Sequence, residues 1–266
     1  MRKAIAIITL VMLLLIPTLF FDGIMPEIGD PNSPANTHVS NYYIEKSLEE
    51  TNCPNIVTGI LADFRGFDTM FETTVMFLAG LGAVLILSNR PNIKRRIIIP
   101  RNILNKRSKS GEPRYKTINK DVMITIFEPL MMIYAMYVYF HGEISLGGGF
   151  QAGALLGLAY VIDVMIVPNR SKRLFDLNKA KALSLGGIGT FIYVLAGILT
   201  MAGGGLCLEY DKLPFGLSHA ESHSAGILMI ELGVTICVMA TIITILNAIM
   251  TRVTFDDDPV KRREEE

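Results

Sequence analysis

Six long apolar runs limit this chain to a narrow set of folds. A hydrocarbon core about 30 Å thick is crossed by an α-helix of roughly 20 apolar residues. Six stretches have about that length, and their approximate bounds are Ala4–Phe21, Thr69–Ser88, Val122–Phe140, Phe150–Val167, Leu183–Gly203 and Ala225–Met250. Because a bilayer is spanned only by helices or by closed barrels, we predict an all-α, polytopic membrane protein.

The first run begins like a secretory signal peptide, since Arg2 and Lys3 precede it. Its apolar part is long for such a signal, and no small-x-small cleavage site follows directly. We therefore expect this run to stay on the chain as a transmembrane helix.

The positions of the basic residues test the number of crossings. With Met1 inside and six helices, the inner segments hold 2, 11, 5 and 4 Lys and Arg residues, and these segments are 1–3, 89–121, 168–182 and 251–266. The outer segments hold only 3 of the 25 basic residues, an asymmetry that the positive-inside rule requires. Removing one helix would move every later loop to the other side and destroy it. We predict six transmembrane helices with both termini in the cytoplasm.

A basic stretch, Arg90–Lys120, separates two groups of helices. We predict a two-helix unit with an outer loop in residues 1–89, a cytoplasmic linker in residues 90–120, a four-helix unit in residues 121–252 and a charged cytoplasmic tail in residues 253–266. The outer loop contains several prolines, and we expect it to be irregular with a short helix near Tyr42–Glu50.

The composition excludes several classes of protein. Lys plus Arg and Asp plus Glu number 25 each, so the basic excess that nucleic-acid binding needs is absent. Three cysteines are too few for a disulfide-rich scaffold. Cys53 and Cys207 are both expected on the outer side, where a disulfide is allowed but not implied, and Cys237 is expected to fill space inside a helix bundle. No nucleophile stands beside a base, so we expect no catalytic site in this chain and leave open whether it belongs to an enzyme complex.

Four acidic residues fall within the apolar runs, namely Glu72, Glu128, Asp163 and Glu231. An ionised carboxylate facing lipid costs several kcal/mol. A buried carboxyl group can instead take and release a proton, as ion translocation requires. Glu128 also precedes Pro129, which removes one helical hydrogen bond and frees a carbonyl oxygen. Glu128 and Glu231 are therefore the first candidates for a proton or sodium site.

The other two acids have simpler roles that the sequence leaves open. Glu72 lies near a helix end, where it can reach water. Asp163 lies near the inner end of its helix, where it can pair with Arg170 or Lys172. We keep both as candidates for the ion path beside these structural roles.

The chain has four histidines. His38 lies in the outer loop and is expected to be solvated, whereas His141 ends a helix at a membrane surface and is a candidate proton relay. His219 and His223 are four residues apart, as paired metal ligands on a helix can be, but no third ligand is evident nearby. We therefore expect no bound metal and predict that His223 relays protons, because it leads into the helix that carries Glu231.

A glycine-rich stretch, HGEISLGGGF at residues 141–150, precedes the fourth apolar run. The consecutive glycines Gly147–Gly149 permit backbone conformations closed to other residues, and we predict a tight turn against a partner. Gly153 and Gly157 then form a GxxxG pair, a pattern that lets membrane helices pack closely.

The motif Leu146-Gly-Gly-Gly-Phe-Gln-Ala-Gly153, preceded by His141-Gly142, resembles the signature HGxxxPGGGFQGG of the B subunit of multi-subunit sodium/proton antiporters (Mrp, also called Mnh). Leu146 and Ala152 replace the usual proline and glycine. The resemblance covers about residues 119–252, and Ser224–Gly233 is similar to the last helix of the archaeal versions in membrane-bound hydrogenase-type complexes.

A second motif, NIVTGILADFRGFDTM at residues 55–70, resembles the segment NxVNxILVDFRGFDTxGE near the end of the large A subunit of the same antiporters. The chain departs from that segment at Thr58 and Phe71. Asp63, Arg65 and Asp68 belong to its intact core, and we expect them to form a local charge cluster that fixes the loop. The chain therefore resembles an A-subunit tail joined to a B subunit.

This resemblance implies a chain that works inside a larger complex in the cell membrane of a prokaryote. Its partners would be large A- and D-like and small C-, F- and G-like antiporter subunits, with or without a hydrogenase or sulfur-reductase arm. Na⁺ and H⁺ would be the transported ions, and the chain itself would bind no cofactor. Two functions stay open: a share in the ion path, with Glu128 or Glu231 acting with Asp163 and His223, or a purely structural subunit whose glycine faces dock its neighbours.

Overall fold

The computed structural model describes residues 7–16, 18, 29–33, 35–88, 120–166 and 177–257. Within these residues every regular element is a helix, so the all-α prediction is confirmed for them. The chain divides into two compact units, residues 1–47 and residues 48–266. The basic linker of residues 90–119 lies outside the described residues, and so do Arg170 and Lys172, the partners predicted for Asp163.

The first unit contains an apolar helix, Ile7–Ile16, and the start of α2. A π-helical turn, η1 (Ala35–Val39), leads into α2 (Ser40–Thr51), which confirms the short helix expected near Tyr42–Glu50. The described part of the first apolar run is shorter than a membrane span, so a crossing there stays a prediction.

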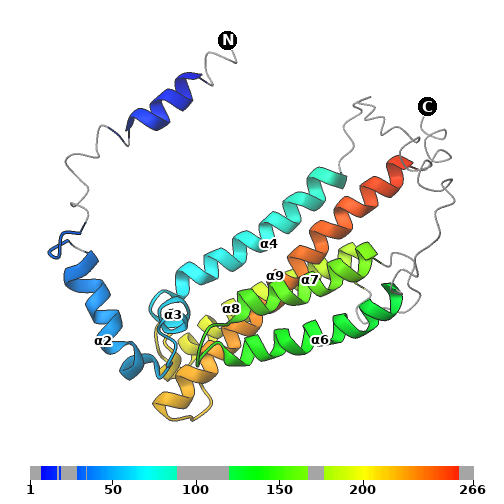
Figure 1. The fold of residues 1–266 in the computed structure, drawn as a ribbon. Coiled ribbons are helices and arrows are strands. Elements are labelled where there is room, and N and C mark those ends of the chain that lie inside the picture. Colours follow the sequence, from blue (N-terminus) through cyan, green and yellow to red (C-terminus); the bar gives the residue numbers. More distant parts are fainter. Residues whose placement is uncertain are drawn as a thin grey trace. The chain divides into compact units, whose positions relative to one another are not determined.

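Five helices of the second unit are long and apolar enough to cross a membrane. They are α4 (Gly66–Ser88), α6 (Lys120–His141), α7 (Gly149–Ile166), α8 (Lys179–Ala202) and α9 (His219–Asp257), and Figure 1 shows them running alongside one another. Their bounds agree with the last five apolar runs to within a few residues. The chain is therefore a multi-pass membrane protein, while the sixth crossing and the cytoplasmic location of the termini stay predictions.

Helix α9 is the central helix of this bundle, since it packs against α4, α6, α7 and α8. Its contact with α7 depends on the GxxxG pair. A Cβ atom on Gly153 would lie 2.7 Å from the carbonyl oxygen of Thr235, and one on Gly157 would lie 3.0 Å from the Cβ atom of Ile242. Both distances are too short for a side chain, so the predicted close packing of these glycines is confirmed.

Helix α4 packs against α8 and α9, although the sequence assigns it to a different unit from theirs. The hydroxyl of Tyr193 in α8 donates a hydrogen bond of 2.7 Å to the carbonyl of Gly66, where α4 begins. The thiol of Cys237 in α9 donates to the carbonyl of Thr73 in α4. Cys237 is fully buried, as expected of a residue that fills space in the bundle.

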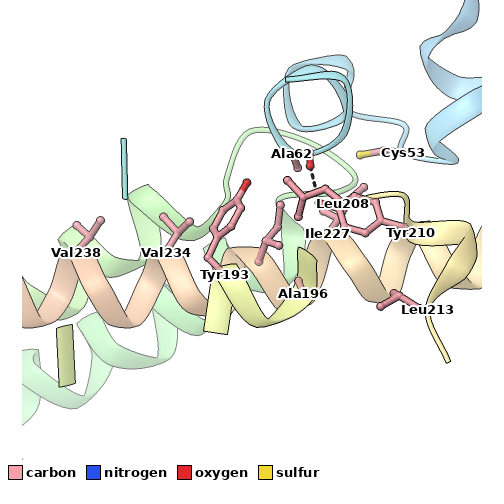
Figure 2. Close-up of a cluster of buried hydrophobic side chains, with 11 residues drawn as sticks. Cys53, Ala62, Tyr193, Ala196, Leu208, Tyr210, Leu213, Ile227, Val234 and Val238 are labelled. Carbon is pink, nitrogen blue, oxygen red and sulfur yellow. Dashed lines mark hydrogen bonds between the residues drawn. The ribbon is translucent and has the colours of Figure 1, made fainter. Parts of the chain in front are cut away.

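Three connecting segments meet at one end of the bundle, which we call the loop end: residues 52–65, 142–148 and 203–218. The first holds α3 (Ile56–Gly59) and the π-helical turn η2 (Ile60–Phe64), and the third holds η3 (Tyr210–Lys212). Figure 2 shows the apolar cluster that joins them, in which the hydroxyl of the fully buried Tyr210 donates a 2.7 Å hydrogen bond to the carbonyl of Ala62. Cys53 and Cys207 are free thiols, so they form no disulfide.

Candidate functional site

Glu231 lies in α9, where the glycine turn of residues 147–149 packs against it. Its side chain is buried, at 8% exposure. Gly148 has a φ of +124°, a conformation that residues with a side chain rarely adopt, and a Cβ atom there would lie 3.0 Å from the Oε1 atom of Glu231. A Cβ atom on Gly149 would collide with the backbone of Glu231. The partner of the predicted tight turn is therefore a helix of the same chain.

The carboxyl group of Glu231 is only partly satisfied by its surroundings. The backbone N–H of Gly149 hydrogen-bonds to it, but the buried Oε2 atom has no hydrogen-bond partner among the described residues. Leaving a buried polar atom without a partner costs about 1–3 kcal/mol. A proton or a small cation bound at Oε2 would remove that cost, so the geometry suits a carboxyl group that exchanges an ion.

A second carboxyl group, Glu143, lies beside Glu231 at the loop end. The hydroxyl of Ser224 donates to both oxygens of Glu143, at 2.8 and 3.1 Å. Burial raises the pKa of Glu143, and the hydrogen bond from Ser224 opposes part of that rise. The Glu143 and Glu231 carboxylates are also near enough to repel each other. Sequence reasoning missed Glu143, although its place two residues after His141, inside the glycine signature, was a usable signal.

The segment before α4 fixes the loop that carries Glu143. The side chain of Asn55 donates to the carbonyls of Gly142 and Ser145, at 2.8 and 2.6 Å, and Thr58 donates to Gly142 at 2.7 Å. The backbone N–H of Asn55 donates to the carbonyl of Glu143 at 2.9 Å. The two sequence motifs, which lie far apart in the chain, therefore form one structural unit.

A second polar group surrounds His223, one turn of α9 nearer the loop end than Ile227. Its Nδ1 atom lies 2.5 Å from a carboxylate oxygen of Asp63, and its Nε2 atom lies 3.4 Å from Asp211. The Nδ1 atom of His219 lies 2.5 Å from the same oxygen of Asp211. The sequence did not single out Asp211, because nothing in the eight residues that separate it from His219 indicates that the chain folds back.

The acids of the second motif divide between two contacts. Arg65 donates to Asp68 through its Nε atom, at 2.6 Å, and these two residues also form an ion pair. Asp63 contacts His223 instead. The expected local cluster of three charges is thus an exposed ion pair beside a contact that reaches α9.

The remaining predicted site residues lie elsewhere. Glu128 in α6 and Asp163 in α7 are buried, and each lies 13 or 14 helical residues from the loop end, which corresponds to about 20 Å at 1.5 Å per residue. Glu72 is exposed on α4. The half-buried ring of His141 stacks on Tyr137, with ring centroids 4.9 Å apart. The structure therefore brings Glu231 and His223 to the loop end and leaves Glu128 and Asp163 at a deeper level.

Two family models match the chain. Residues 120–244 match a domain related to the MnhB subunit of Na⁺/H⁺ antiporters, and residues 31–100 match MbhE, the E subunit of MBH. A probable K⁺/H⁺ antiporter protein of the A/B type from Rhizobium meliloti (strain 1021) is 24% identical over 229 residues, which make up 77% of this chain and 22% of that protein. The chain thus spans about a fifth of the length of that relative.

Two solved structures share the fold. One is the Mrp complex from Dietzia sp. DQ12-45-1b, with a TM-score of 0.58 and 19% identity over 93% of this chain and 25% of that one. The other is the membrane-bound sulfane sulfur reductase, an archaeal respiratory membrane complex, with a TM-score of 0.59 and 21% identity over 93% of this chain and 97% of that one. Both the sequence matches and the fold agree with the resemblance drawn from the two motifs.

Proposed function

We propose, from the union of an MnhB-related domain with a segment matching MbhE, that this chain serves as a membrane subunit of a cation/proton antiporter module. In this proposal it lies in a prokaryotic cell membrane with six crossings and both termini in the cytoplasm. The loop end then faces outward, because the basic segments of residues 89–121 and 168–182 follow or precede the opposite ends of the helices.

The observation that carries the proposal is the buried Glu231 carboxyl group, held against a glycine turn with one oxygen unsatisfied. Such a group binds a proton or a sodium ion by charge, and it releases the ion when a competing one arrives. Na⁺ and H⁺ are therefore the proposed transported ions, and Glu231 is the group that they share at the outer level.

Access to Glu231 runs along α9 from the loop end. His223, with Asp63 and Asp211, lies nearest the surface, and the Glu143–Ser224 pair lies next. These polar groups offer ions a series of contacts in an otherwise apolar bundle. We assign His223 to the entrance of the path and Glu143 to the step before Glu231.

Glu128 and Asp163 form the inner level of the proposed path. Each lies about 20 Å from the loop end on neighbouring helices, α6 and α7, which pack against each other. Neither level alone spans the bilayer, so the path requires groups from neighbouring subunits. This agrees with a chain that contributes part of a conduit rather than forming a whole carrier.

The outer face of α4 is proposed to meet one of those subunits. Phe71 and Val75 are each 62% exposed on it, and the exposed Glu72 lies within the same span. A carboxylate at that depth is costly against lipid, so a protein neighbour or a hydrated cavity must cover it. The proposed partners are the large A- and D-like and the small C-, F- and G-like antiporter subunits, with a hydrogenase or sulfur-reductase arm where the module is driven by redox chemistry.

A purely structural subunit is the second candidate, and the exposed face of α4 favours it as much as it favours a conduit. Purification of the tagged chain in mild detergent, with identification of the proteins that accompany it, tests whether the chain belongs to an antiporter complex. We expect antiporter-like subunits, and we expect deletion of the chain to abolish Na⁺-driven proton movement in membrane vesicles. A chain that purifies alone and carries ions by itself in liposomes would contradict the proposal.

A further inference from the structure

Three side chains at the loop end lie in an arrangement that the proposed ion path does not explain. They are Asp211 of η3 and His219 and His223 of α9. We propose that they bind a divalent transition-metal cation, with Zn²⁺ as the best fit. The binding does not depend on the proposed function, because it follows from the three ligands and their surroundings alone.

The distances between the ligand atoms suit such an ion. The Nδ1 atom of His219, the Nε2 atom of His223 and a carboxylate oxygen of Asp211 all lie within 4.8 Å of one another. Zn²⁺ binds nitrogen at about 2.0–2.1 Å, so two ligand atoms of a tetrahedral site are about 3.3 Å apart. The His223–Asp211 separation is already 3.4 Å, and the His219–Asp211 separation of 2.5 Å widens by a small rotation of exposed side chains.

Asp63 supplies the second, independent observation. Its carboxylate lies 2.5 Å from the Nδ1 atom of His223, on the side of the ring away from Asp211. A carboxylate in that position keeps the proton on Nδ1 and presents the lone pair of Nε2 outward, as outer carboxylates do for the histidine ligands of zinc sites. An ordinary surface pair of histidines has no such orienting group.

The fold holds these ligands in place. Tyr210 precedes Asp211, is fully buried and donates to the carbonyl of Ala62, so the position of Asp211 is tied to that of Asp63 (Figure 2). Burial raises the pKa of Tyr210 well above its ordinary value, and the phenol therefore remains a donor. The first turn of α9 is fixed by Glu221, which accepts hydrogen bonds from the backbone and hydroxyl of Ser218.

The chemistry of the ligands selects the class of cation. Two imidazole nitrogens favour Zn²⁺, Cu²⁺ or Ni²⁺ over Na⁺, Mg²⁺ or Ca²⁺, which prefer oxygen ligands. The carboxylates of Asp63 and Asp211 together balance the charge of a divalent ion. The side chains of His219 and Asp211 are 54% and 39% exposed, so an ion reaches them from the solvent and a fourth position stays open for water.

Titration of the purified full-length chain with Co²⁺, a spectroscopic stand-in for Zn²⁺, tests the site. We expect one Co²⁺ per chain with the strong visible absorption of a tetrahedral ion, and displacement of that ion by Zn²⁺. His219→Asn and Asp211→Asn, both at exposed positions where folding is preserved, should each weaken binding by about tenfold or more, and Asp63→Asn by about 10–100-fold. His38→Asn, which alters an exposed histidine outside the group, is the matched control and should bind Co²⁺ normally.

Three results would overturn the inference. The first is the absence of stoichiometric Co²⁺ binding to the wild-type chain. The second is unchanged Co²⁺ affinity in both His219→Asn and Asp211→Asn. The third is a spectrum dominated by thiolate-to-cobalt charge transfer, which would place the metal on the free cysteines instead.

Discussion

The Nδ1 atom of His223 lies 2.5 Å from a carboxylate oxygen of Asp63, a residue 160 positions earlier in the chain. This contact joins the segment before α4 to the start of α9, and Tyr210 and Asn55 make parallel connections through their own hydrogen bonds. The loop end is therefore built from both sequence motifs at once. The polar groups that lead to Glu231 depend on this joint construction.

Gly148→Ala should destabilise the chain and displace the Glu231 carboxylate. The substitution places a side chain at a φ of +124° and a Cβ atom 3.0 Å from Oε1 of Glu231, and strain of this kind costs about 1–3 kcal/mol. Thermal unfolding of the purified chain would show a lower midpoint. Gly82→Ala is the matched control, because a Cβ atom on Gly82 meets nothing within 4 Å, and its midpoint should not fall. Equal midpoints for the two variants would contradict the packing described for the glycine turn.

Tyr210→Phe should loosen the loop end. The substitution removes the buried 2.7 Å hydrogen bond to Ala62 and leaves that carbonyl without its donor, at a cost of about 1–3 kcal/mol. Thermal unfolding measures the loss. Tyr134→Phe, at a position 55% exposed, should leave the midpoint within error of wild type, and a fall of the same size in both variants would mean that the Tyr210 hydroxyl has no special role.

The last five transmembrane helices could be predicted because apolar length alone specifies them. Gly153 and Gly157 were also predictable, since a GxxxG pair indicates a close helix contact whatever its partner. The meeting of Asp211 with His219 and His223 could not be predicted, because it depends on how the loop between α8 and α9 folds back. The same holds for Glu143, whose proximity to Glu231 is set by hydrogen bonds from Asn55 and Thr58 to the glycine loop, across more than 80 residues of sequence.

The Cys53 thiol should react slowly with maleimides. Burial raises its pKa to about 11, so its reactive thiolate fraction is small at pH 8 and grows about tenfold per pH unit up to pH 11. Peptide mass spectrometry after timed labelling gives the rate at Cys53. Ser145→Cys, at an exposed loop position, supplies a fast-reacting control in the same chain. Similar rates at the two positions at pH 8 would show that the segment around Cys53 is open to solvent.

Glu143→Gln should stabilise the chain above acidic pH. Because burial raises the pKa of Glu143 in the folded state, the folded chain binds more protons than the unfolded chain, and stability falls as pH rises from about 4.5 through the raised pKa. Glutamine removes this loss while retaining an acceptor for Ser224. Unfolding midpoints at pH 4 and pH 8 should therefore differ more between wild type and variant at pH 8. A variant that is less stable than wild type at pH 8 would show that Glu143 is a favourable ion in the folded chain.

The most direct test of the central claim is Na⁺-driven proton movement in proteoliposomes that carry the assembled complex, measured for Glu231→Gln, for Glu128→Gln and for the control Glu45→Gln, which alters an exposed acid on α2. Loss of the charge at Glu231 removes an interaction of about 1.5–3 kcal/mol with the ion, so we predict a fall in apparent ion affinity on the order of 10–100-fold. Glu128→Gln should also reduce transport, and Glu45→Gln should not. Normal transport by fully assembled complexes that carry Glu231→Gln and Glu128→Gln would contradict a role for this chain in the ion path and leave it a structural subunit.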